Sequence, residues 1–253
     1  MVKAIMHGCN GKMGQVISRI VKEDPSIEIV AGIDIYTKCL AEYPVYANEF
    51  ECEEEADVIV AFPPASAVDR LLEYSVSKSL PIVIATTGCS EEQKEKMEQA
   101  ARKIPVFTSA NMSLGISLLT ELVSRAAKVL GDQFDIEITE MHHNRKLDAP
   151  SGTALMIADS IRDSLDRDSE YIYERQSRRA AREKQEIGIH SVRGGTIVGV
   201  HSVLFAGQDE LVEIKHTAQS RDLFAVGAIQ AAIYLKEQKP GMYHMSDLVK
   251  SMC

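Results

Sequence analysis

The first hundred residues alternate between short runs of β-branched residues and longer segments whose apolar side chains recur at helical spacing. This alternation is typical of βαβ units and predicts an α/β fold with a parallel sheet. Ser90 and Gln93 match a capping box, which predicts where one of the helices begins. The expected strands cover residues 2–6, 27–33, 58–62, 82–86 and 104–107. The expected helices cover residues 12–23, 67–79 and 90–103.

Beyond about residue 111 the pattern changes. Three alternating segments separated by glycines predict an antiparallel or mixed sheet in this part of the chain. The expected strands are residues 134–141, 187–192, 196–204 and 210–217, and the expected helices are 113–130, 152–165 and 221–236. A central segment built differently from its flanks predicts two domains, residues 1–112 with 221–253 and residues 113–220.

Composition narrows the possible partners. The 253 residues carry 28 Lys plus Arg against 37 Asp plus Glu, a formal charge of −9. This balance argues against nucleic acid as a partner, because binding a phosphate backbone requires a positive surface. Five scattered cysteines without metal-ligand spacing indicate reduced thiols and a cytoplasmic location. No segment resembles a secretory signal or a membrane span, so no membrane partner is expected.

One run of mixed charge, residues 174–186, contains four arginines among its basic residues. Such runs usually form a solvated helix or loop, which is the interpretation favoured here. The alternative is a basic rim close to an anionic ligand.

A glycine-rich turn follows the first expected strand and opens the first expected helix. Gly8, Gly11 and Gly14 give the spacing GxxGxxG, and Cys9 stands where the dinucleotide fingerprint GxGxxG begins. Asp34 follows the second strand, where a carboxylate can accept hydrogen bonds from a ribose. Together these features favour nucleotide binding over an ordinary turn in an α/β domain.

The residues near Asp34 bear on the choice of cofactor, because a 2′-phosphate needs a nearby cation. Ile35 offers no charge, whereas Lys38 is within reach along the chain. We therefore expect NADH to be preferred and leave NADPH possible. Two further loops, residues 85–88 and 109–112, follow strands and suit contact with a nicotinamide, although such loops are often only turns.

Residues 140–155, EMHHNRKLDAPSGTAL, hold the second group of candidate residues. Histidine is the residue type that can exchange a proton near neutral pH, and Lys146 can donate a proton, so a loop with His142 and His143 is suited to general acid catalysis. Ser151 is a candidate N-cap, which leaves the helix N-terminus at Gly152 and Thr153 suited to binding a carboxylate.

Metal binding by this loop is the less favoured interpretation. His142, His143 and Asp148 are the available ligands, but adjacent histidines in an extended backbone point to opposite faces. No other His or Cys lies at the usual spacing, so no metal is predicted and Asp148 is interpreted as structural.

These motifs closely resemble the dihydrodipicolinate reductase family over nearly the whole chain. The resemblance is carried by the glycine-rich turn, by residues 140–155 and by SANMSLG, RGGTIVGVH, HTAQSR and KPGMYHMSDL, in the family's order. It implies a Rossmann-like nucleotide-binding domain and a central α+β domain that binds substrate and assembles a homotetramer. Two departures are a basic segment without glycine, residues 175–185, and Ile35 where the family often has Arg after its acid.

The resemblance also implies roles for individual residues. His142 and Lys146 would be the catalytic proton donors, and His143, Gly152 and Thr153 would bind the substrate carboxylates. For the cofactor it implies Gly8, Cys9, Asn10, Gly11, Lys12, Met13, Asp34, Ala85, Thr86, Thr87, Ser109, Ala110, Asn111 and Met112.

The resulting hypothesis is hydride transfer from NAD(P)H to a cyclic imine dicarboxylate, which forms tetrahydrodipicolinate in lysine and diaminopimelate biosynthesis. One alternative is another dehydrogenase of the aspartate pathway, but no cysteine lies in a candidate catalytic loop. The second alternative is an NAD(P)-sensing binding protein without turnover, which would not need paired proton donors.

Overall fold

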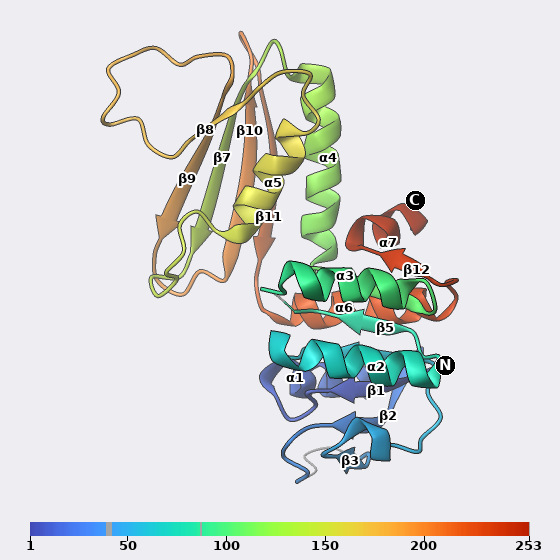
Figure 1. The fold of residues 1–253 in the computed structure, drawn as a ribbon. Helices are drawn as coiled ribbons and strands as arrows, with labels where there is room; N and C mark the ends of the chain where they lie inside the picture. The colour runs from blue at the N-terminus through green and yellow to red at the C-terminus, as the bar shows by residue number, and fades with distance from the viewer. Residues whose placement is uncertain (39–41, 87, 253) are drawn as a thin grey trace. The chain divides into compact units, whose positions relative to one another are not determined.

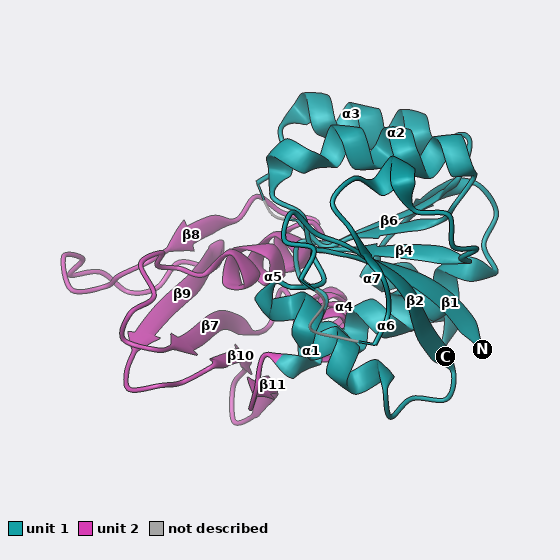
Figure 2. Cartoon of the chain, turned by 90° about the horizontal axis from the view of Figure 1, so that it is seen from below, with its two compact units in different colours: residues 1–114, 222–253 teal, residues 115–221 magenta. Residues whose placement is uncertain are grey.

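The computed structural model describes residues 1–38, 42–86 and 88–252. The chain divides into two compact units, Met1–Leu114 with Asp222–Cys253 and Gly115–Arg221, shown in teal and magenta in Figure 2. Unit 1 is thus built from both ends of the chain, whereas unit 2 is one continuous segment.

Unit 1 contains a sheet of seven strands in the order β12-β6-β5-β4-β1-β2-β3, and every neighbouring pair is parallel (Figure 1). The expected parallel sheet is confirmed. The strands are β1 (Val2–His7), β2 (Ile27–Ile33), β3 (Val45–Tyr46), β4 (Val58–Ala61), β5 (Ile82–Ile84), β6 (Pro105–Thr108) and β12 (Gly241–Tyr243).

Helices cover both faces of this sheet, as the alternation of side chains along a strand requires. Ala4 and Met6 of β1 share a buried cluster with α1 and α6, whereas Ile5 between them belongs to the cluster that contains α2 and α3. The helices are α1 (Lys12–Val21), α2 (Val68–Lys78), α3 (Glu91–Ala101), α6 (Asp222–Lys236) and α7 (Met245–Ser251), with short 3₁₀ segments at Glu49–Glu51 and Ala65–Ala67.

The boundaries of these elements follow local signals to different degrees. Ser90 is the N-cap of α3 and forms the predicted capping box with Gln93. Helix α1 ends at Val21, two residues before the predicted end. The short strands β3 and β12 were not predicted, because runs of two or three residues carry no readable alternation.

Unit 2 contains a mixed five-stranded sheet in the order β11-β10-β7-β9-β8. Strand β10 is antiparallel to both of its neighbours, whereas β7, β9 and β8 run parallel. The expectation of an antiparallel or mixed sheet is confirmed as mixed. The elements are α4 (Leu114–Leu130), β7 (Asp135–His142), α5 (Gly152–Arg162), β8 (Glu170–Ile172), β9 (Glu186–Arg193), β10 (Gly199–Ala206) and β11 (Leu211–Ala218).

The core of unit 2 lies between this sheet and two helices. Leu119 and Val123 of α4 and Ile157 of α5 pack against Ile138 of β7 and Phe205 of β10, all of them buried.

Strand β10 begins at Gly199 rather than at residue 196, because the preceding glycines form a turn in which Ile197 N–H donates to the Gly194 carbonyl.

The basic run of residues 174–186 is not the fully solvated segment that was favoured. Arg175 donates to Glu137 (2.8 Å) and to Glu186 (2.6 Å), and Arg182 donates to Glu137 (3.2 Å) and Asp135 (2.8 Å). Glu137 and Glu186 lie on strands β7 and β9, so two of the arginines fasten this segment to the sheet. At Arg175 and Arg182, ion pairs with carboxylates take the place of the contacts with water that the sequence interpretation favoured.

Among the described residues, no helix combines the length and the apolar character needed to cross a membrane.

Candidate active site

The glycine-rich turn joins β1 to α1 at the carboxyl end of the parallel sheet. Gly8 has a positive φ of +80°, and a Cβ on Gly14 would collide with the Gly8 carbonyl oxygen and lie 2.6 Å from Cys9 Cα. Gly11 is the N-cap of α1, which has neither a side-chain cap nor an acidic residue in its first turn. This N-terminus can therefore offer N–H groups and its positive dipole to the pyrophosphate of a dinucleotide.

Asp34 lies beside this turn and is held by it. Its Oδ2 accepts a hydrogen bond from Asn10 N–H (3.0 Å), and its Oδ1 accepts one from Tyr36 N–H (3.0 Å). The side-chain amide of Asn10 donates to the carbonyls of Tyr36 (2.5 Å) and Lys38 (3.2 Å). The turn and the acid at the end of β2 therefore form one ordered unit, in which the carboxylate is oriented before any ligand binds.

The remaining expected residues of the turn differ in what their side chains do. Lys12 is exposed, Met13 packs against the core and Cys9 is buried within it, only 3 % exposed. Met112 is also 3 % exposed and belongs to the same core cluster. For Cys9 and Met112 only the backbone is therefore available to a ligand.

The two other expected cofactor loops lie together. Thr86, Ser109 and Ala110 line one cavity of about 580 Å³ at the carboxyl ends of β5 and β6. Ala85 packs partly against the core, and Asn111 N–H donates to Ser109 Oγ (3.2 Å). Thr87 lies outside the described residues.

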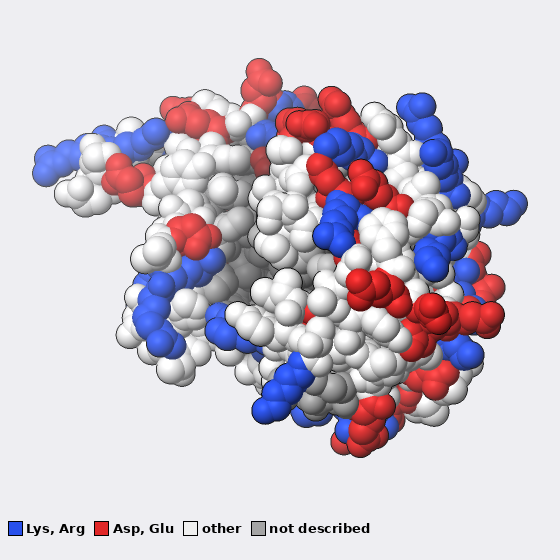
Figure 3. Space-filling model, turned by 60° about the horizontal axis from the view of Figure 1, so that its bottom comes forward, with Lys and Arg blue, Asp and Glu red and all other residues white. Residues whose placement is uncertain are grey.

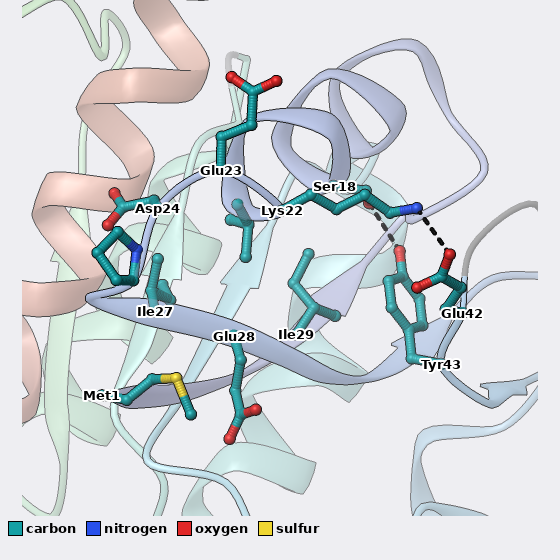
Figure 4. Close-up of a pocket in the computed structure, with 12 residues that line it drawn as sticks. Met1, Ser18, Lys22, Glu23, Asp24, Ile27, Glu28, Ile29, Glu42 and Tyr43 are labelled. Carbon is teal, nitrogen blue, oxygen red and sulfur yellow. Dashed lines mark hydrogen bonds and ion pairs between the residues drawn. The ribbon is translucent and has the colours of Figure 1, made fainter.

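A further cavity of about 680 Å³ lies between α1 and β2 and is lined by Ser18, Lys22, Ile27 and Tyr43 among others (Figure 4). Met1 and Ile27 lie at the amino ends of β1 and β2, so this cavity is at the opposite edge of the sheet from the glycine-rich turn. Open α/β sheets bind nucleotides at the carboxyl edge, and we therefore assign no cofactor contact here.

In unit 2, His142 is the last residue of β7 and is held by a buried carboxylate. Its Nδ1 lies 2.6 Å from Glu140 Oε2, and the Glu140 side chain is fully buried. Arg193 makes two hydrogen bonds to the same carboxylate, of 2.6 and 2.9 Å. Burial alone would raise the pKa of Glu140, but the hydrogen bonds from Arg193 and His142 outweigh it and lower this pKa to about 2.

Lys146 and His143 lie in the loop that follows. Lys146 Nζ is 2.8 Å from Asp148 Oδ1, and its side chain is 21 % exposed, so it is held in place but accessible. His143 Nδ1 is buried without a hydrogen-bond partner among the described residues. Burial, followed by the nearby positive charges of Arg221 and Arg145, lowers the pKa of His143. A binding anion would relieve both conditions.

The loop ends at the N-terminus of α5. Ser151 is the N-cap as predicted, and its Oγ accepts a hydrogen bond from Ala154 N–H (3.1 Å). The first turn of α5 has no acidic residue, and no atom lies within 4 Å of the position of a Cβ on Gly152. This terminus thus leaves open space beside Gly152 and Thr153, which suits a carboxylate.

The basic side chains of this site, among them Lys146 and Arg193, lie together although the whole chain is acidic. Lys and Arg are interspersed with Asp and Glu over the face drawn in Figure 3, so the charge of −9 is not concentrated there in one patch.

Among the described residues, no group of three or more His, Cys, Asp or Glu side chains is placed to hold a metal ion.

Three residues of this site had no role in the sequence interpretation, namely Glu140, Arg193 and His201. Glu140 could have been found, because residues two apart on a strand share a face and a carboxylate two before a histidine can bind it. Arg193 and His201 reach the site only through the register of β9 and β10 with β7, which pairs them with His142 and Glu140. No local sequence pattern specifies that register.

His201 makes the stability of unit 2 sensitive to acid. It is 4 % exposed, its Nε2 lies 3.1 Å from Ser151 Oγ, and burial followed by the charge of His142 lowers its pKa from 6.5 to about 4. Between these two values the unfolded chain binds a proton that the folded chain does not, so stability falls as the pH falls, by about 3 kcal/mol over the window.

We therefore expect His201→Gln, which keeps a polar partner for Ser151, to lose less stability than the wild type between pH 7 and pH 4.5, roughly the range of that titration. Denaturant unfolding at both pH values measures this difference. The exposed His244 provides the matched control His244→Gln, which should retain the wild-type acid sensitivity. Equal acid sensitivity in all three proteins contradicts the assignment.

Known protein families match both parts of the chain. The family models "Dihydrodipicolinate reductase, N-terminus" and "Dihydrodipicolinate reductase, C-terminus" match residues 2–112 and 115–249. A 4-hydroxy-tetrahydrodipicolinate reductase from Caldanaerobacter subterraneus subsp. tengcongensis is 54 % identical over 250 residues, with 99 % of each chain covered. Another from Clostridium novyi is 46 % identical over 251 residues, again covering 99 % of each.

Among solved structures, a dipicolinate-bound dihydrodipicolinate reductase from Paenisporosarcina sp. TG-14 is similar, with a TM-score of 0.82 and 27 % identity, covering 96 % of this chain and 97 % of that one. The resemblance stated from the motifs is confirmed, as is the Rossmann-like α/β fold with a second mixed sheet. The chain belongs to the dihydrodipicolinate reductase family.

Proposed function

We propose that this chain is a 4-hydroxy-tetrahydrodipicolinate reductase of lysine and diaminopimelate biosynthesis. It reduces 4-hydroxy-tetrahydrodipicolinate (dihydrodipicolinate) to tetrahydrodipicolinate with NADH or NADPH. The observation that carries the proposal is the loop of residues 142–153, where a carboxylate-held histidine, an accessible lysine and an open helix N-terminus occur together. The names of close relatives, which span nearly the whole chain, support the same activity.

Residues of unit 2 bind the substrate as a dicarboxylate. The Gly152 and Thr153 N-terminus of α5 provides one cradle, and His143 contributes a buried nitrogen that lacks a described partner. Helix dipole and imidazole together hold the ring in one orientation, which lowers the entropic part of the barrier.

A bound NAD(P)H would supply a hydride to C4 of the ring, and water would be lost from the 4-hydroxy ring before or during this step. The electron pair delivered to C4 leaves negative charge on the C3 and ring-nitrogen side, which must take up a proton. His142 and Lys146 donate that proton, since both carry nitrogen donors accessible from the loop. One hydride and one proton together balance the reduction.

The residues of unit 1 fit a dinucleotide. The N-terminus of α1, which has no side-chain cap, would hold the pyrophosphate, and the oriented Asp34 carboxylate would accept hydrogen bonds from the adenosine ribose. Thr86, Ser109, Ala110 and the neighbouring backbone of Ala85 and Asn111 bind the nicotinamide end.

We expect NADH to be preferred. Asp34 repels a 2′-phosphate, and the next residue, Ile35, is apolar and 81 % exposed, so it supplies no counter-charge. The KM for NADPH should exceed that for NADH by about tenfold or more, equivalent to about 1.4 kcal/mol. Ile35→Arg should lower the KM for NADPH and leave the KM for NADH nearly unchanged. Equal KM values for both cofactors in the wild type contradict the preference.

Oxidation of NADH, followed by near-ultraviolet absorbance with enzymatically generated substrate, tests the proposed activity. A non-catalytic NAD(P)-sensing protein would bind NADH without oxidising it. Another aspartate-pathway dehydrogenase would oxidise or reduce an aldehyde instead, and would need a nucleophile such as cysteine. Of the described cysteines, Cys9 and Cys52 are buried and Cys89 is half-buried.

Assembly as a homotetramer through the unit 2 sheet, which the family resemblance implies, is part of the same proposal. Light scattering in solution measures it, and a monomeric mass would contradict it.

A further inference from the structure

We propose that Glu140 and Arg193 are positioning residues for His142, and that the Glu140 carboxylate also sets the position of the α5 N-terminus relative to that histidine. The inference rests on the proposed reaction, in which His142 gives up a proton. It adds the two groups that decide which nitrogen of His142 carries this proton and where it points.

The carboxylate is fully saturated by hydrogen bonds. Glu140 Oε2 is bonded to His142 Nδ1 (2.6 Å) and Arg193 Nη1 (2.9 Å), and Oε1 accepts from Arg193 Nη2 (2.6 Å) and from Ser151 N–H (3.1 Å). Arg193 also donates to the Asp148 carbonyl (2.7 Å). The buried Glu140 carboxylate therefore links residues at the end of β7, at the end of β9 and in the last part of the 143–151 loop through hydrogen bonds.

This arrangement fixes the tautomer of His142. A carboxylate accepts but does not donate, so Nδ1 keeps its hydrogen in both protonation states and Nε2 is the atom that gains or loses the proton. Nε2 makes no hydrogen bond to a described residue. Gly199 lies beneath it, and a Cβ there would stand only 3.2 Å from Nε2. Any proton that His142 gives up therefore leaves from Nε2, at the end of the strand.

Arg193 is needed because a lone buried carboxylate would take up a proton. Burial opposes ionisation of Glu140, and a neutral carboxyl group could donate to Nδ1 and reverse the tautomer. The bidentate guanidinium contact keeps the carboxylate ionised, and a single positive charge on lysine cannot reproduce its two parallel bonds. The pair therefore acts as one unit.

Other charged and titratable groups surround His142 and are the same in every variant considered below. The His201 ring of β10 lies edge-on with its centroid 5.3 Å away, and His216 of β11 lies behind His201. Lys146, His143 and Arg145 belong to the following loop. Because these groups are unchanged, a change in the tautomer of His142 on altering Glu140 reports the loss of that carboxylate.

The first test is the tautomer of His142, measured by ¹⁵N NMR on histidine-labelled protein without substrate and assigned with His142→Gln. The wild type should show protonated Nδ1, whereas Glu140→Gln should populate protonated Nε2, because the Gln amide can donate to Nδ1. Protonated Nε2 in the wild-type neutral ring overturns the proposal. This measurement needs no turnover, and His142→Gln serves only to assign the signal, so its outcome is separate from any failure of the proposed activity.

The second test is kinetic. Glu140→Gln should lower kcat by about 100-fold, within the range seen for residues that orient a catalytic histidine, and leave the KM for NADH unchanged. A fall in kcat without a change in the KM for NADH separates the positioning of His142 from a general loss of structure. The matched control is Glu121→Gln on α4, where the glutamate accepts a hydrogen bond from Arg125 (2.5 Å); its kcat should equal that of the wild type.

Should Glu140→Gln fail to fold, Arg193→Lys provides the same readout. It retains the positive charge but loses the bidentate contact, so kcat should fall about tenfold while the KM for NADH stays unchanged. A kcat within about threefold of the wild type in a folded variant overturns the positioning role.

Discussion

Replacing His142 by glutamine, or Lys146 by alanine, is expected to lower kcat for reduction of the dicarboxylate by about 10²–10⁴-fold each, the usual contribution of a positioned general acid. His142 is 13 % exposed and Lys146 is 21 % exposed, so both are held by their surroundings while their nitrogens remain accessible. Steady-state oxidation of NADH with enzymatically generated substrate measures the loss.

The readout that separates catalysis from binding is the affinity for NADH, which fluorescence titration measures without turnover. It should not change in either variant, because the residues assigned to NADH belong to unit 1. Lys128→Ala, at an exposed lysine on α4 outside the loop, should have the wild-type kcat. Unchanged turnover in both loop variants would remove the proposed proton donors, whereas loss of NADH binding as well would indicate a structural defect.

The second large effect is expected for Gly14→Ala. The added Cβ would overlap the Gly8 carbonyl and the backbone of Cys9, and backbone atoms cannot rotate away as a side chain can. The turn must therefore move, and the N–H groups of α1 no longer face the pyrophosphate. We expect the Kd for NADH to rise by about 100-fold or more, equivalent to about 3 kcal/mol.

A graded series makes this prediction specific. A Cβ on Gly11 would stand 3.1 Å from the Gly8 carbonyl oxygen, so Gly11→Ala should weaken NADH binding less than Gly14→Ala. Gly194→Ala in unit 2 meets only Ile197 Cδ1, at 3.8 Å, and should bind NADH normally. Far-ultraviolet circular dichroism should show that the Gly14→Ala variant is folded. An unchanged Kd for NADH in Gly14→Ala would contradict the assignment of the turn.

The sequence predicts the elements that depend on local signals. The capping box at Ser90 and the Ser151 N-cap are contacts between residues three apart, and both are present. The parallel sheet follows from long alternating segments. The strands β3, β8 and β12 have two or three residues each and depend on the neighbours that pair with them.

The candidate site was predictable to a different extent. The candidate catalytic and binding residues of the loop 140–155 lie close together in the sequence, so His142, His143 and Lys146 are found without a structure. The partners that orient them are joined by strand register, as Arg193 is to Glu140 across 53 positions. For the same reason, the pairing of Arg175 and Arg182 with Glu137 reverses the expectation of a solvated run.

The order of the strands in unit 1 has a consequence for synthesis of the chain. Helix α6 covers β1 and β4, and β12 pairs with β6, yet both elements lie in Asp222–Cys253, after the whole of unit 2. During synthesis, Ala4, Met6 and Val60 therefore have α1 but not α6 against their apolar face until the residues beyond 221 have emerged from the ribosome. The continuous unit 2 has all of its strands earlier, so it can complete its core first, and unit 1 closes only after it.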